Sequence, residues 1–143
     1  MIRRAALVAV LLFGCQQRGH HATAPDVLDR VEDGLRAIDL AVPQDRAHTF
    51  AQTIWESVLL STDCASAVEH TANAAPPERG RAVSEASRTC HFSLPADPQA
   101  RPEDVVTAFL VETSTRALTA DPSPRAHELA ARIGALAPSL ITR

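Results

Sequence analysis

The side chains best able to do chemistry in this chain are its three cysteines and six histidines, and their spacing departs from that of common haem, di-iron and zinc centres. Cys90-His91 has no second cysteine three residues before it, so a CxxCH haem-attachment motif is absent. Asp45-x-x-His48 is a single acid–histidine pair, whereas di-iron bundles need two Glu-x-x-His motifs. His127-Glu128 is not followed by the second histidine of a zinc-binding HExxH helix. The sequence therefore predicts no catalytic residue, no metal ligand and no cofactor.

Most of the histidines have an ordinary structural explanation. Three fall on segments with helical spacing, where a solvent-facing or hydrogen-bonded histidine is far more common than a ligand or a base. His20-His21 is a pair of imidazoles without a third ligand and would make a poor metal site. Because no nucleophile, base and orienting group share one pattern, we predict that the chain is not an enzyme. The three helical histidines are His48, His70 and His127, and His91 begins a proline-rich stretch that we expect to be an extended loop over 91–101.

The amino terminus has the composition of a secretory signal. Arg3 and Arg4 form a charged region, residues 5–13 form an apolar run, and Gly14 is the small residue before a cleavage point. The apolar run is too short to span a bilayer as a mature helix. The sequence therefore predicts a signal peptide over residues 1–14.

The end of this signal, Leu12-Phe13-Gly14-Cys15, resembles the cleavage motif of bacterial lipoproteins, in which a cysteine follows the small residue. The resemblance covers the signal only. It implies that Cys15 becomes the first mature residue and carries acyl chains such as palmitate, and that residues 15–24 are a lipidated tether. Each buried CH₂ adds about 0.8 kcal/mol of membrane affinity, so two or three chains give stable anchoring. The alternative is an ordinary secreted protein that is cut near Gly14, with Cys15 incidental.

The residue after the cysteine is Gln16. By resemblance to the sorting of lipoproteins in Gram-negative bacteria, the lack of an aspartate there favours the outer membrane, on its periplasmic face or at the surface. The implied partners are the membrane, through the lipid, and another envelope protein. Residues 16–24 span at most roughly 30 Å when fully extended, so the domain must work close to the bilayer.

With Cys15 bound to lipid, Cys64 and Cys90 remain as a pair in an oxidising compartment, where a disulfide is the default. They are nearly symmetric about Pro76-Pro77, so a helical hairpin turning there would bring the two sulfurs to the same level. Chain entropy predicts a stabilisation of roughly 3.5 kcal/mol for the enclosed loop of about 27 residues. A metal pair or a redox couple has less support, because the chain has no CxxC.

The mature chain is acidic. Without Arg3 and Arg4, 12 of the 14 basic residues remain against 17 acidic residues, which gives a net charge near −5. The chain has four Phe, one Trp and no Tyr, so it offers few rings on which bases could stack. Both features argue against a nucleic-acid partner.

The apolar spacing predicts an all-α fold, a small bundle of four or five helices with one disulfide, over a single domain at 25–143. Prolines precede most of the helical segments, as expected for proline at the first helical position. The segments with helical spacing are 25–40, 44–60, 102–119 and 124–137, with a weaker one at 78–90, and the prolines are Pro25, Pro43, Pro76, Pro77, Pro102 and Pro124.

The stretch 44–74 contains no Gly or Pro and keeps one apolar stripe, so we predict a single long helix. The alternative is a break at Ser61-Thr62-Asp63, which has good N-cap chemistry. Trp55 is predicted to lie in the core with its apolar neighbours Phe50, Ile54 and Leu59.

Two functions are compatible with these features. The leading hypothesis is a non-enzymatic lipoprotein that serves as an interaction or structural module of the cell envelope, which predicts an exposed apolar patch. The alternative is a helical bundle that binds a lipid or a small apolar ligand, which predicts a buried apolar pocket of several hundred Å³. The many alanines of the predicted helices could leave room for such a ligand, or could allow close helix packing.

Overall fold

The computed structural model describes residues 23–57, 59–91 and 101–141, and within these ranges the secondary structure is helical, without a strand. The all-α prediction is therefore confirmed, although the described ranges contain six α-helices where four or five were expected. In chain order the elements are α2 (Pro25–Leu40), the 3₁₀ turn η2 (Pro43–Asp45), α3 (Arg46–Glu56), α4 (Thr62–Asn73), α5 (Arg79–Thr89), α6 (Pro102–Ala120) and α7 (Pro124–Leu140).

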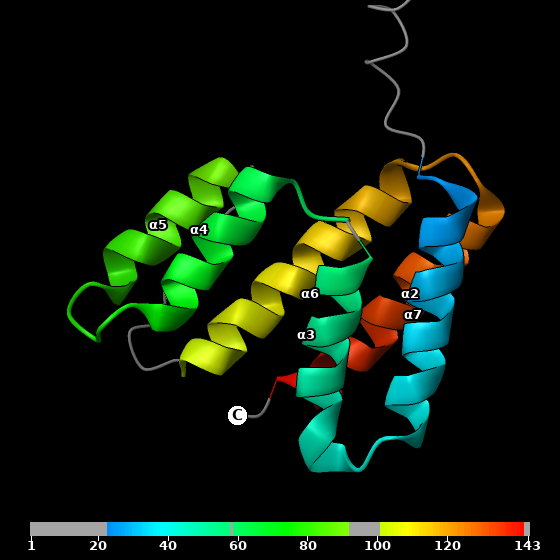
Figure 1. The fold of residues 1–143 in the computed structure, drawn as a ribbon, viewed down its shortest axis with the longest axis horizontal. Coiled ribbons are helices and arrows are strands. Elements are labelled where there is room, and N and C mark those ends of the chain that lie inside the picture. The colour runs from blue at the N-terminus through cyan, green and yellow to red at the C-terminus, as the bar shows by residue number, and fades with distance from the viewer. Residues whose placement is uncertain (1–22, 58, 92–100, 142–143) are drawn as a thin grey trace, which may run out of the picture.

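The six α-helices form three antiparallel hairpins, α2–α3, α4–α5 and α6–α7 (Figure 1). Helix α6 is the shared partner, because it packs on α7 within its own hairpin, on α3 from the first hairpin and on α4 from the second. The second hairpin lies on one side of α6, and the first hairpin lies on the other (Figure 1).

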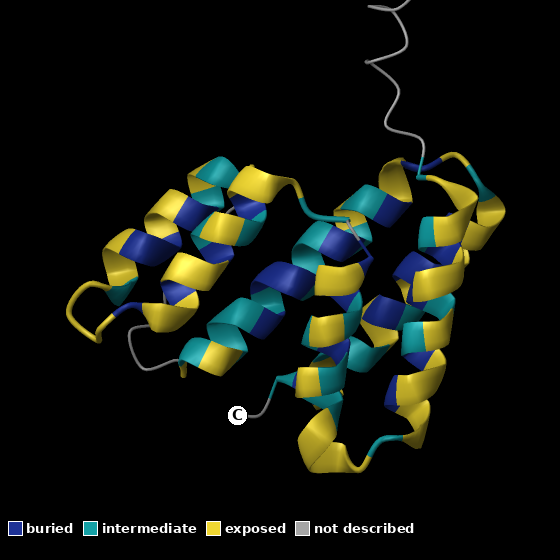
Figure 2. Cartoon of the chain, in the orientation of Figure 1, coloured by how far each residue is buried: buried dark blue, intermediate teal, exposed yellow. Residues whose placement is uncertain are grey.

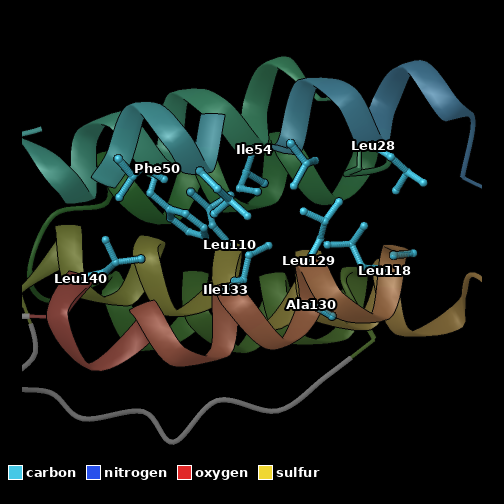
Figure 3. Close-up of a cluster of buried hydrophobic side chains, with 13 residues drawn as sticks. Leu28, Phe50, Ile54, Leu110, Leu118, Leu129, Ala130, Ile133 and Leu140 are labelled. Atoms are coloured by element: carbon cyan, nitrogen blue, oxygen red, sulfur yellow. The ribbon is translucent and has the colours of Figure 1, made fainter. Parts of the chain in front are cut away.

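Two hydrophobic cores follow from this arrangement. The larger core joins α2, α3, α6 and α7 (Figure 3), and the smaller core joins α4 and α5 to the other side of α6. Leu60 and Val106 contact both cores. The largest side chains of the first core are Leu28, Val31, Leu35, Ile38, Phe50, Ile54, Leu110, Leu118, Leu129, Ile133 and Leu140, and the second core consists of Cys64, Val68, Val83, Ala86 and Phe109.

Helix α6 is buried on two of its sides. Phe109 and Leu110 are both fully buried, yet they belong to different cores, because successive helical residues point about 100° apart. Residues 104–115 include no exposed position (Figure 2). The side chains of Glu112 and Arg116 are nevertheless 47% and 54% exposed, so α6 is a central helix that still reaches solvent.

The long helix predicted over 44–74 is wrong. Helix α3 ends at Glu56, and α4 begins at Thr62 with Ser61 as its N-cap, whose hydroxyl accepts a hydrogen bond from the Cys64 backbone N–H at 3.2 Å. A continuous helix would have carried α4 in line with α3. The break instead lets α4 pack on the opposite side of α6, where it buries Val68 completely. This burial and the N-cap together outweigh the helical spacing of the intervening residues.

The prolines begin helices as predicted at three places, with Pro25, Pro102 and Pro124 at the starts of α2, α6 and α7. Pro43 begins the 3₁₀ turn instead, and α5 begins two residues after Pro77. The hairpin α4–α5 turns at Pro76-Pro77 and carries the predicted disulfide. Cys64 in the first turn of α4 is bonded to Cys90 at the end of α5, and their Cα atoms lie 4.9 Å apart.

We predict that Gly34→Ala destabilises the protein. A Cβ at this position would lie 1.9 Å from Cγ2 and 2.8 Å from Cβ of Thr53 on α3, so no rotation of the Thr53 side chain relieves the clash. Overpacking of this kind costs about 1–3 kcal/mol. The matched control is Gly134→Ala in α7, where no atom lies within 4 Å and where alanine should stabilise the helix by about 0.5–1 kcal/mol. Thermal melts of both variants test this, and a change of the same sign in both would contradict it.

We also predict that the α4–α5 hairpin depends on its disulfide. Replacing Cys64 and Cys90 together by alanine should lower the free energy of unfolding by up to about 3.5 kcal/mol, because the unfolded chain loses a long closed loop. Denaturant titration measures the loss, and hydrogen exchange locates it. Amide protection should fall more in α4 and α5 than in α2 and α7, since the core that holds α4 and α5 is the smaller one. An unchanged midpoint, or an equal loss of protection everywhere, would contradict this prediction.

Candidate functional site

The structure does not bring the chemistry-bearing side chains together. Cys15 and His20-His21 lie outside the described residues. The other histidines, His48, His70, His91 and His127, are all exposed, and they stand on different helices or at a helix end. Among the described residues, no three His, Cys, Asp or Glu side chains are grouped so that they could hold a metal ion.

His91 was the histidine at the edge of the expected loop, and it has an unusual backbone. The φ of His91 is 59°, in the left-handed region. This residue follows Cys90 at the end of the α4–α5 hairpin. Its carbonyl oxygen accepts a hydrogen bond from the guanidinium of Arg116 on α6. The residue therefore fixes the end of α5 against α6 through its backbone, while its ring stays in solvent. The remainder of the expected loop, 92–100, lies outside the described residues.

None of the helices in the described ranges combines the length and the apolar character that crossing a bilayer would require.

One surface feature is an apolar groove between α3 and α4, with α6 beneath it. Its base is formed by Val106 and Leu110 of α6, and its walls include Ala51 and Trp55 of α3 and Ala72 of α4. The groove encloses about 320 Å³. It exists because α3 and α4 pack on two different sides of α6 and leave a gap between them (Figure 1). We call this surface the α3–α4 groove.

The groove continues into a wider hollow of about 580 Å³ toward the start of α3. The two parts are continuous, since His48, Ala51, Ala72 and Val106 line both. Pro43 and Gln44 lie at the far end of the hollow, and the first turn of α6 and the end of α7 complete its walls. The continuous groove therefore follows α3 from the turn before it to Trp55.

Trp55 was predicted to be a core residue, and this is wrong. Its side chain is 42% exposed at the rim of the groove, whereas Phe50 and Ile54 are fully buried. These two neighbours, four residues apart, take the core-facing side of α3, and Trp55 is turned about 100° away from Ile54. Because the chain breaks before α4, the helices of the described ranges leave the side of α3 that Trp55 occupies partly open. Only the tertiary arrangement reveals this exposed ring.

The rim of the groove is acidic. Glu56, Glu69 and Glu103 line it and take part in none of the ion pairs formed among the described residues. The one arginine, Arg101, donates to both carboxylate oxygens of Asp104 at 2.9 and 3.1 Å, and this carboxylate raises the pKa of its guanidinium. The groove therefore presents an excess of negative charge around an apolar base.

A second feature, which the sequence reasoning missed, fixes the place where the amino-terminal segment joins the folded body. The buried carboxylate of Asp121, between α6 and α7, accepts hydrogen bonds from the backbone N–H of Ser123 at 2.8 Å and of Thr23 at 2.7 Å. These donors hold the pKa of Asp121 below its ordinary value of 3.8, that of Ser123 foremost. The aspartate two residues before Ser123 is a typical turn signal and could have been recognised, but its bond to Thr23 could not.

We predict that Asp121→Asn destabilises the protein at neutral pH, because one of the two N–H donors then faces an amide nitrogen that cannot accept. A depressed pKa means that the carboxylate stabilises the fold fully above 3.8 and loses this effect as the pH falls through the lower folded-state value. The melting temperatures of wild type and variant should therefore differ at neutral pH and converge in strong acid. Glu128→Gln, on the exposed face of α7, is the control, and its melting temperature should match that of wild type at each pH. A gap that persists in acid would contradict the prediction.

The chain matches no protein-family model, and neither the curated proteins nor the solved structures contain a match to it. Its function must therefore be inferred from its own residues, from the amino-terminal motif and from the α3–α4 groove.

Proposed function

We propose that this chain is a lipid-anchored protein of the bacterial cell envelope, held at the outer membrane on its periplasmic face or at the surface. Its helical domain is a non-enzymatic module that binds another envelope protein through the α3–α4 groove. The observation that carries the proposal is the open apolar groove with Trp55 exposed at its rim.

The exposed apolar surface supports a binding role. Trp55 is large, apolar and partly exposed, and aromatic residues of this kind dominate the energy of protein interfaces. In the chain just before Pro43, which lines the wider hollow, Leu40 is 88% exposed and Val42 is 51% exposed. Apolar surface that runs along one side of a domain is typical of an interaction site.

The amino-terminal motif supports the location. Leu12-Phe13-Gly14-Cys15 resembles a lipoprotein cleavage motif, and the first described residue is Thr23, whose N–H donates to Asp121. The chain between Cys15 and Thr23 can extend over less than about 30 Å, so a lipid on Cys15 would keep the groove near the bilayer.

The alternative function is the binding of a lipid or a small apolar ligand. The volume of the groove, about 320 Å³ beside a hollow of about 580 Å³, is in its favour. The acidic rim is against it for the commonest lipids, because fatty acids and anionic phospholipids would bring negative charge to Glu56, Glu69 and Glu103. A site for such ligands would also be expected to bury most of the ligand, whereas this groove lies open along α3.

We predict that Cys15 carries the lipid. The full chain, expressed in a Gram-negative host and isolated from its membranes, should have the intact mass of a chain that begins at Cys15 with acyl groups attached. Cys15→Ser should lose both the lipid and the membrane association, since the thioether can no longer form. Phe13→Ala keeps the cysteine and restores a small residue to the motif, so this control should stay lipidated. A free thiol at Cys15 in the native product, or release of wild type into the medium, would refute the proposed location.

A further inference from the structure

We infer that the α3–α4 groove binds a cationic amphipathic helix of the partner protein, with the apolar face of that helix against α6 and its basic residues at the rim. This inference rests on the proposed binding function and specifies the chemistry of the partner.

The shape of the groove suits a helix. Both α3 and α4 pack on α6, and the groove separates them, so a further helix could lie parallel to α3 over Val106 and Leu110. Packed helices approach to about 8–10 Å between axes, and small side chains at the contact allow the shorter distances. Ala51 on one wall and Ala72 on the other provide such small side chains. The 11 residues of α3 extend over about 16 Å, which is room for three helical turns.

The negative charge of the rim favours a partner segment with positive charge. Glu56 and Glu69 lie on opposite walls of the groove, on α3 and α4, and both are exposed. The carboxylate of Glu56 accepts a hydrogen bond from Gln52 at 2.9 Å, but neither glutamate has a cationic partner within the described residues. A helix with Lys or Arg flanking its apolar face would meet both carboxylates at once.

The same charges disfavour a second copy of this chain as the occupant. The mature chain is acidic, with 17 acidic residues against 12 basic ones once Arg3 and Arg4 are removed. Two grooves placed face to face would bring Glu56, Glu69 and Glu103 against the same residues of the other copy. Like charges facing one another across an interface are unfavourable, so the partner is expected to be a different and basic polypeptide.

Trp55 provides a direct signal for occupancy, because it is the only tryptophan in the chain and lies at the rim. The probe is a synthetic amphipathic helix built from leucine and lysine, without tryptophan. Binding should shift the emission of Trp55 to shorter wavelength in a saturable manner, since the ring leaves water. The effect should weaken with added salt, because the rim charges are exposed. Three parallel titrations use the same peptide with glutamate in place of lysine, a scrambled cationic peptide without an apolar face, and palmitate.

Matched variants assign the signal to the groove. Glu56→Lys combined with Glu69→Lys should weaken binding of the cationic peptide about tenfold, given the modest energy of exposed ion pairs. Glu128→Lys on the exposed face of α7 makes the same kind of charge change elsewhere and should leave the affinity within about twofold of wild type. Ala72→Gln should obstruct the groove and weaken binding, whereas Ala131→Gln, exposed on α7, should not. All five substituted sites are exposed, and circular dichroism verifies that each variant keeps its helical content.

The outcomes separate this inference from the proposed function. A shift with the lysine peptide alone, lost in the groove variants, supports the inference. An equal response to the glutamate or scrambled peptide, a response only to palmitate, or no response at all overturns it. The proposed location is tested separately, by whether Cys15 carries the lipid. A lipidated chain that ignores the peptide would refute only the partner, and an unlipidated chain that binds the peptide would refute only the location.

Discussion

The structure depends on the burial of α6 from two opposite sides. Phe109 and Leu110 are neighbours in sequence and both fully buried, yet one joins α6 to α4 and α5 and the other joins it to α2, α3 and α7. Without this helix the first and second hairpins would have no common core. The disulfide between Cys64 and Cys90 closes only the second hairpin, so it strengthens the smaller core without connecting it to the larger one. Cohesion between the two sides therefore comes from apolar contacts along α6.

The groove is a consequence of the same constraint. To cover the second side of α6, α4 must leave the direction of α3, and the break at Ser61 allows this. Two helices that pack on different sides of a third leave a gap between them, so the half-buried Val106 borders the groove there, beside the fully buried Leu110. Trp55 is exposed for that reason, and Glu56 and Glu69 lie on the two walls of a groove with an apolar base. The proposed binding surface thus needs no insertion or special loop.

The fixed connection at Thr23 relates this surface to the amino-terminal segment. The carboxylate of Asp121 holds the start of the folded body beside the turn between α6 and α7, next to the beginning of α2 (Figure 1). The exposed Leu40 lies at the other end of α2, about 24 Å along its 16 residues. A lipid on Cys15 would therefore tether the domain from its Thr23 end, with Leu40 at the far end of α2.

The amino-acid sequence by itself determined the helical class, the starts of three helices at prolines, and the pairing of Cys64 with Cys90, because these depend on local backbone chemistry and on the count of cysteines. It left open whether 44–74 is one helix, since the spacing of Ile54 and Val68 fits both a straight helix and two shorter ones. The tertiary structure decided that question, the exposure of Trp55 and the bond from Thr23 to Asp121. Each of these depends on residues distant in sequence, and periodicity within a segment says which side of a helix is apolar but not which neighbour will cover it.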